Sequence, residues 1–229
     1  LSVYNGKDHF SANYDGDTDS KDGSTMNWGN TIVSARWNYI FNNRLFSNTT
    51  VSYNNYLFDV NSYNNNKYAN SMGASIINRY SADYRSGIND WSYQIDFDYN
   101  PSPIHHIKFG TGYIYHRFRP EVMTSKISEK TGDKVDRDTT YHSIANSRIY
   151  GHELSAYLED NIKVNDRLRL NLGLHFSLFQ VQKQSYSSLQ PRVSARYQLG
   201  KDVTLKASYT QMSQYVHLLS SMPIAMPTD

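Results

Sequence analysis

Histidines, serines and carboxylates are plentiful in this sequence, but they do not fall into the spacings that catalysis requires. A Gly-x-Ser-x-Gly turn, which presents the nucleophile of many hydrolases, is absent, and so is a glycine loop that could bind phosphate. His105 and His106 could bind a metal ion, yet adjacent residues of a strand point to opposite faces and cannot easily share one ion. We therefore expect neither an enzyme nor a bound cofactor.

Three aspartates near the start have the alternate spacing of a calcium-binding loop: Asp15, Asp17 and Asp19. The glycine due at the sixth position of such a loop is Ser20, and the bidentate carboxylate due at the twelfth is Met26. We interpret the aspartates as part of a solvated loop, with adventitious calcium binding as the alternative.

The elements that carry these residues are predicted to be antiparallel strands, because apolar and polar residues alternate along much of the chain. The clearest apolar sets are Leu168, Leu170, Leu172, Leu174 and Phe176, and Trp91, Tyr93, Ile95, Phe97 and Tyr99. Between 154 and 209 such strands are joined alternately by tight turns and longer polar segments. Each strand thus has one apolar and one polar face.

Composition indicates what covers the apolar face. Only 38% of the 229 residues are hydrophobic, yet 14% are aromatic, including 20 tyrosines. A soluble sandwich needs two apolar inner faces, whereas a membrane barrel needs one that meets lipid. A net charge of +2 without a long basic run excludes a nucleic-acid partner. Cysteine is absent, and no apolar stretch is long enough for a membrane-spanning helix.

The pattern predicts about nine membrane crossings, near 3–14, 27–41, 45–60, 91–100, 106–118, 152–164, 168–179, 191–199 and 203–213. Tight turns near 42–44, 101–105, 165–167 and 200–202 alternate with long outer loops near 61–90 and 119–150, as periplasmic turns and extracellular loops do. Residues 76–84 are then an extension above the membrane. Nine is odd and an open edge cannot lie in hydrocarbon, so we expect one domain, residues 1–229, that is part of a larger barrel.

The two parities predict two sets of functional residues. Aromatic residues at strand ends suit the membrane interface: Trp37, Tyr39, Phe41, Trp91 and Tyr93. Polar residues on the opposite parity would face the lumen: Gln94, Asp96, Asp98, Lys108, His116, Arg169, His175, Arg192, Arg196 and Lys206. Asp160 is an exception on the apolar parity, which a bulge or a position at the periplasmic interface would explain.

The segments AYLEDNIKVNDRLRLNLGLHFS (156–177) and SLQPRVSARYQLGKDVTLKASYTQ (188–211) resemble the mid-barrel region of TonB-dependent outer-membrane receptors. The Pro191-Arg192 strand, the loop 217–220 and the stretch 90–120 resemble one subgroup of that family. The resemblance implies an all-β, 22-stranded transmembrane barrel in the bacterial outer membrane, blocked by a plug domain that this sequence lacks. It also implies contact with the TonB complex through an N-terminal region, and import of a scarce bulky nutrient such as a siderophore, cobalamin or a glycan.

Two other readings remain open. A soluble, surface-exposed β-sandwich that binds or adheres would bury Leu168–Phe176 inside the protein, and a small self-contained porin would need an even number of strands. The expected partners of the barrel are outer-membrane lipid, the plug and remaining strands of the same protein, the TonB complex and a small-molecule or glycan substrate. The sequence does not identify that substrate, a partner lipoprotein or an oligomeric state.

Overall fold

The computed structural model of the chain describes residues 1–16, 20–144 and 148–216. These residues form ten antiparallel strands in one sheet. The strands are β1 (Ser2–Asp15), β2 (Lys21–Asn42), β3 (Leu45–Ala69), β4 (Ser75–Tyr99), β5 (His105–Thr131), β6 (Lys134–Ile144), β7 (Ile149–Lys163), β8 (Leu168–Val181), β9 (Gln184–Gln198) and β10 (Thr204–Thr210). No helix occurs in this described part of the chain.

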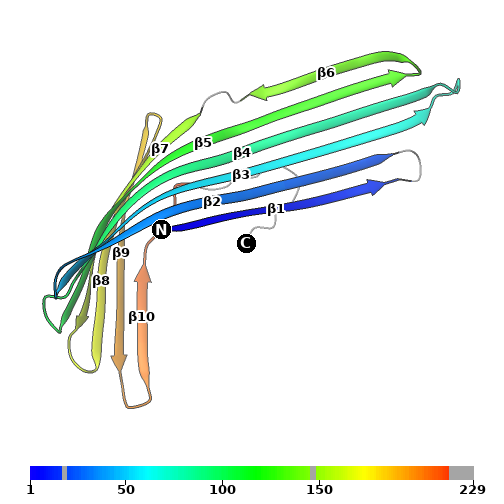
Figure 1. Cartoon of the computed structure of the whole chain (residues 1–229). Coiled ribbons are helices and arrows are strands. Elements are labelled where there is room, and N and C mark those ends of the chain that lie inside the picture. The colour runs from blue at the N-terminus through cyan, green and yellow to red at the C-terminus, as the bar shows by residue number, and fades with distance from the viewer. Residues whose placement is uncertain (17–19, 145–147, 217–229) are drawn as a thin grey trace.

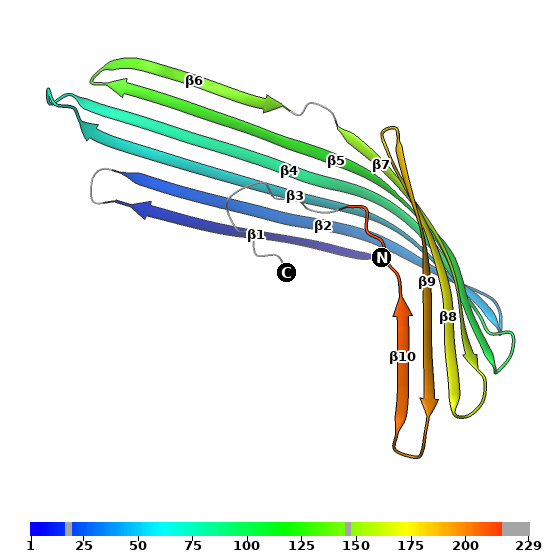
Figure 2. The same ribbon diagram turned by 180° about the vertical axis from the view of Figure 1, so that it is seen from behind.

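The strands follow one another across the sheet in chain order, from β1 through β5 and then from β7 to β10. β6 lies off this path and pairs only with the second half of β5, from Val122 to Thr131, which we call its outer half. Nine strands therefore make up the wall, as the nine predicted crossings require. The wall is strongly curved but not closed, and β1 and β10 are its two ends (Figure 1). Seen from behind, β7–β10 turn away from the direction of β1–β5 (Figure 2).

Asparagine and serine side chains shape the short turns at one end of the wall. Asn42 Oδ1 accepts hydrogen bonds from the backbone N–H groups of Arg44 (2.9 Å) and Leu45 (3.1 Å). Asn165 does the same for Arg167 and Leu168, at 2.9 and 2.8 Å. A side-chain oxygen that satisfies the backbone two and three residues ahead favours a tight reversal. The sequence therefore specifies these turns locally.

The prediction of irregular outer loops at 61–90 and 119–150 was wrong in its local structure. β3 runs on to Ala69 and β4 starts at Ser75, so the two form a long hairpin whose tip contains Gly73 at a φ of 79°. β5 continues to Thr131 and returns as β6. Residues 76–84 are the outer half of β4 and not a separate crossing, as expected.

Burial in this sheet is the reverse of that in a soluble protein. The apolar parity is the exposed one: Leu158, Leu172, Leu174 and Phe176 are 40–57% exposed. The polar parity is mostly half-buried, and Ser177 and Gln190 are 2% and 3% exposed. The β-sandwich alternative, which requires Leu168–Phe176 to be buried, is therefore not favoured. An exposed apolar band on a curved antiparallel wall is typical of a membrane barrel.

Candidate functional site: the polar face of the sheet

The register brings all ten predicted lumen-facing residues to one face of the wall. Asp98 lies opposite Lys108, Gln94 opposite Gly112, and Asp96 opposite Gly110. On the other half of the wall, His175 is paired with Gln190 and Arg192 with Gly173. We call this surface, formed by the polar parity of β1–β10, the polar face. Contacts between side chains of neighbouring strands divide the polar face into three regions: a buried histidine, a cluster of apolar residues and a basic end.

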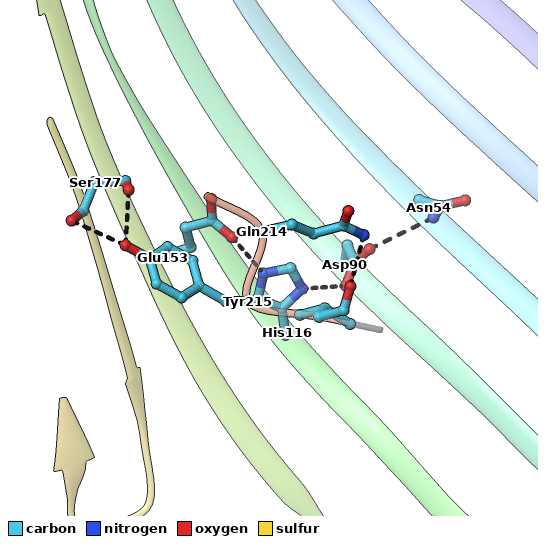
Figure 3. Close-up of polar contacts among 8 residues, drawn as sticks. Asn54, Asp90, His116, Glu153, Ser177, Gln214 and Tyr215 are labelled. Carbon is cyan, nitrogen blue, oxygen red and sulfur yellow. Dashed lines mark hydrogen bonds and ion pairs between the residues drawn. The ribbon is translucent and has the colours of Figure 1, made fainter. Parts of the chain in front are cut away.

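A buried histidine forms the centre of the polar face (Figure 3). His116 is only 6% exposed, and Asp90 Oδ1 accepts a hydrogen bond from its Nδ1 at 2.8 Å. Its Nε2 lies 3.5 Å from Glu153 Oε2. Gly151 is the cross-strand partner of His116, and a Cβ there would lie 3.2 Å from the ring of Phe179. The missing side chain lets the Phe179 ring pack edge-on against His116, with ring centroids 5.9 Å apart.

The segment after β10, residues 211–216, turns over the polar face and covers this region (Figures 2 and 3). The Tyr215 ring stacks on Phe179 with centroids 5.3 Å apart, and its hydroxyl lies 2.8 Å from Ser177 Oγ. Gln190 Nε2 donates to the same Ser177 oxygen at 2.9 Å. The Tyr215 side chain is therefore held by a ring contact and a small hydrogen-bond network, and the backbone N–H of Gln211 donates to the Pro191 carbonyl at 3.1 Å. The sequence analysis assigned residues 211–213 to the last crossing, near 203–213, and missed the inward course of the segment.

Apolar side chains gather on the polar face where the strands extend beyond this histidine. Met26, Phe58 and Val60 are 5–7% exposed and pack together with Trp28, Tyr56 and Tyr84. The register places these residues on the same parity as Asn54 and Asp90, since Asn54 pairs with Asp90 and Tyr56 with Ile88. We call this cluster the aromatic shelf. The sequence analysis missed it because it assigned a polar character to the whole of this parity.

At the short-turn end the polar face becomes basic. Lys163, Arg169, Arg196 and Lys206 are consecutive cross-strand partners on β7–β10. A hollow of about 1140 Å³ opens there, and all four residues line it. Lys163 Nζ lies 2.8 Å from the exposed Asp166 carboxylate, which lowers the pKa of Asp166. Like charges directly opposite one another repel, and an anionic group bound between them relieves this repulsion. The cationic row therefore attracts anionic groups.

The two adjacent histidines contact carboxylates on opposite faces of the sheet. His105 Nδ1 lies 2.7 Å from Asp160, whereas His106 Nε2 lies 2.7 Å from Asp98 on the polar face. The pairing of β7 is regular on both sides, so Asp160 is not at a bulge; it lies beside the short turns. No group of three metal-ligating side chains occurs among the described residues. Asp17 and Asp19 of the calcium motif lie outside those residues, as does the segment 217–220.

On the opposite face, aromatic residues form two bands. Trp37, Tyr39 and Phe41 are in successive edge contacts, and Phe97 stacks on Phe109 with centroids 4.9 Å apart. Further along the strands, Trp91 packs on Tyr53 and lies opposite Tyr115. Trp91 and Tyr99 are eight residues apart on β4, which corresponds to ~27 Å along a strand and ~21 Å in height at a tilt of about 40°. This agrees with the apolar band of a barrel, about 25 Å tall.

These features define the class of protein as an antiparallel wall of a membrane barrel with one lipid-compatible face and one polar, partly basic face. The sequence model of the family "TonB dependent receptor-like, beta-barrel" matches residues 2–214. The chain belongs to this family of outer-membrane receptors, whose members are transporters rather than enzymes.

Solved structures of such receptors resemble the chain. The ferric preacinetobactin receptor BauA of Acinetobacter baumannii aligns with 82% of this chain and 30% of its own, at 10% identity and a TM-score of 0.48. The FrpB iron transporter of Neisseria meningitidis aligns with 91% and 36%, at 13% identity and a TM-score of 0.43. The FpvAI–pyocin S2 complex aligns with 91% and 37%, at 12% identity and a TM-score of 0.41.

The chain thus spans about a third of the length of these receptors. A search of curated proteins found no match. No helix in the described part of the chain is long and apolar enough to cross a membrane.

Proposed function

We propose that this chain forms part of the wall of an outer-membrane receptor that imports a scarce, bulky nutrient, namely a siderophore complex, cobalamin or a glycan. The family match over residues 2–214 carries the proposal. The two faces support it, because the exposed apolar face suits lipid and the half-buried polar face suits a lumen. The aromatic bands that include Trp37, Tyr39, Phe41, Trp91 and Tyr93 would lie at the two membrane interfaces.

Within the receptor, the polar face would contact the plug domain, water and the passing nutrient. The aromatic shelf offers the partly exposed rings of Trp28, Tyr56 and Tyr84 to a large ligand on the outer side. The cationic row at the short-turn end would face anionic groups of the plug or the nutrient. The remaining strands of the same protein would pair with β1 and β10, because unpaired backbone groups are costly in lipid.

Uptake measurements test this proposal. The gene for the full-length receptor would be deleted in its own bacterium, and uptake of labelled ferric siderophores, cobalamin and oligosaccharides compared with that of the parent. Loss of uptake of one class, restored by the wild-type gene and abolished by a protonophore that de-energises the TonB complex, is the expected result. Unchanged uptake of all three classes would contradict the proposal.

The binding role of the polar face can be tested in the same strain. Replacing the partly exposed Trp28 and Tyr56 by alanine should raise the nutrient concentration needed for half-maximal uptake while leaving the amount of receptor in the outer membrane unchanged. Exposed Tyr68, near the hairpin tip and outside the shelf, provides a matched aromatic control.

A further inference from the structure

A sharp change from aromatic to polar residues occurs on the outer, apolar face of the wall. Tyr53, Trp91, Tyr115 and His152 are consecutive cross-strand partners and form one row. The next row on the same face consists of Asn55, Asn89, Arg117 and Tyr150. Tyr115 stacks on Tyr150 across the boundary, with ring centroids 6.0 Å apart. Apart from Tyr150, the row above the aromatic band is therefore polar.

Three arginines gather at this boundary. Arg117 and Arg119 lie two residues apart on β5 and so share its outer face. Arg119 and Arg148 each lie one residue beyond the last β5–β7 pair, Phe118–Ile149, and both are exposed. The Nε of Arg117 is buried without a hydrogen-bond partner. None of the three forms an ion pair within the described residues.

A small hollow lies on the same outer face, and Arg148 is the one of the three arginines that lines it. Its volume is about 300 Å³, and the residues that line it are Arg148, Ile149, Tyr150, His152, Gln180 and Gln182. His152 pairs with Gln180 in the register of β7 and β8, so the polar side chains project outward from neighbouring strands. Guanidinium, amide and phenol groups are hydrogen-bond donors, and the guanidinium fork matches phosphate oxygens. The hollow thus presents donors and positive charge to the exterior of the wall.

We propose that Arg117, Arg119 and Arg148, together with this hollow, bind the phosphate of a lipid head group in the outer leaflet. The proposal rests on the proposed function only for the orientation of the wall in the membrane. Aromatic bands lie at head-group level, and basic residues just beyond them attract anionic lipid. A free phosphate ion would have no reason to prefer the lipid-facing side, and a nutrient passing through the lumen would meet the opposite face. Position and charge together therefore select a lipid.

Native mass spectrometry of the full-length receptor in detergent tests the proposal, with phosphatidic acid as the probe and phosphatidylcholine of the same acyl chains as its comparison. The wild type is expected to retain phosphatidic acid preferentially. The triple variant Arg117→Gln/Arg119→Gln/Arg148→Gln should bind it roughly 100-fold more weakly. Lys126→Gln/Lys130→Gln/Lys134→Gln removes the same charge from the β5–β6 hairpin, away from the hollow, and should bind phosphatidic acid like the wild type. Arg148→Gln alone, which lies outside the strands, gives an intermediate loss and serves if the triple variant does not fold.

Equal retention of phosphatidic acid by the two triple variants would overturn the proposal. Displacement of the lipid by millimolar inorganic phosphate would also overturn it, because the site would then bind free phosphate. Lipid retention is measured without any nutrient. A loss of phosphatidic acid in the outer-face variant would therefore support the lipid site even if no nutrient uptake were found. Conversely, a receptor that imports a nutrient but shows no preference for phosphatidic acid would refute this inference alone.

Discussion

His116 Nδ1 and Asp90 Oδ1 lie 2.8 Å apart, although the two residues are separated by 26 positions in the chain. Adjacent strands bring them together as direct partners in the register of β4 and β5. Only 8% of the His116 side chain and 20% of the Asp90 side chain are exposed. This is the most buried of the histidine–carboxylate pairs between described residues.

Removing one member of this pair should destabilise the wall. Asp90→Ala leaves His116 buried without its acceptor, and breaking a buried pair typically costs about 3 kcal/mol. The free energy of unfolding of the full-length receptor, measured by denaturant titration in detergent, is the readout. The comparison is Asp98→Ala, whose partner His106 is 39% exposed, and which should cost about 1 kcal/mol or less. An equal loss in both variants would show that burial does not set the strength of the pair.

The assignment of the two faces predicts opposite effects of one added charge. Ala156→Arg places a guanidinium on the exposed apolar face in the row of Ile95 and Phe176. Near the bilayer midplane this should cost about 2–4 kcal/mol. Gln94→Arg adds the same charge to the polar face one residue away in register and should be nearly neutral. Folding into vesicles, followed by the heat-dependent gel mobility, measures both. A larger loss for Gln94→Arg would reverse the assignment.

Two glycines of the polar face should differ in their tolerance of a methyl group. A Cβ at Gly110 would lie 2.8 Å from the Tyr157 ring and 2.9 Å from Asp96 Oδ1, the two groups that hydrogen-bond to each other. Gly110→Ala is therefore expected to cost about 1–3 kcal/mol by overpacking. At Gly173 the nearest atom would be 3.5 Å away, which is ordinary contact. Denaturant unfolding of Gly173→Ala should match the wild type, and comparable losses at both positions would contradict this packing.

The segment over the histidine should control access to it. Tyr215→Ala removes the stacking on Phe179 and the hydrogen bond to Ser177, so the rate of His116 modification by diethyl pyrocarbonate should rise severalfold. Tyr215→Phe keeps the ring and loses only the hydroxyl, whose hydrogen bond is worth about 1 kcal/mol, and should give a smaller rise. Peptide mass spectrometry follows the modification of His116, with exposed His9 as the internal standard. An unchanged rate in Tyr215→Ala would show that the segment does not cover the histidine.

The sequence predicted the membrane part of the wall better than the part above it, for a physical reason. Where one face meets lipid, alternate residues must be apolar, and Leu168–Phe176 shows this directly. In the outer part of β3 both faces meet water or polar neighbours, so Asn64, Asn65 and Asn66 carry no period, although all three belong to the strand. Hydrogen bonds between strands hold this region, and periodicity does not report them.

The candidate site was predicted in its parity but not in its groupings. The side of the wall on which His116, Arg169 and Arg196 lie follows from counting by twos. Which residues meet depends on the register between strands, which no single strand encodes; Asp90 and Glu153 were therefore missed as partners of His116. The aromatic shelf was missed for a different reason. The alternation of polar and apolar residues is imposed only where one face meets lipid. Further out along the strands no lipid constrains either face, so an aromatic residue such as Phe58 can lie on the inner, otherwise polar face.

The long β3–β4 hairpin keeps one register from the Leu45–Tyr99 pair at its base to the Ala69–Ser75 pair at its tip, so its height is a matter of strand length alone. Adding two residues to each arm of a hairpin moves its tip outward and leaves every side chain below on its original face. A change by one residue within an arm reverses the faces of everything beyond it. Natural variants of this hairpin should therefore differ in length by even steps within each arm, with odd changes confined to the tip or absorbed by a bulge such as the register shift between Arg85 and Gly87 in the β4–β5 pairing. The part of the receptor that the surroundings meet can thus diversify while the membrane-embedded part stays intact.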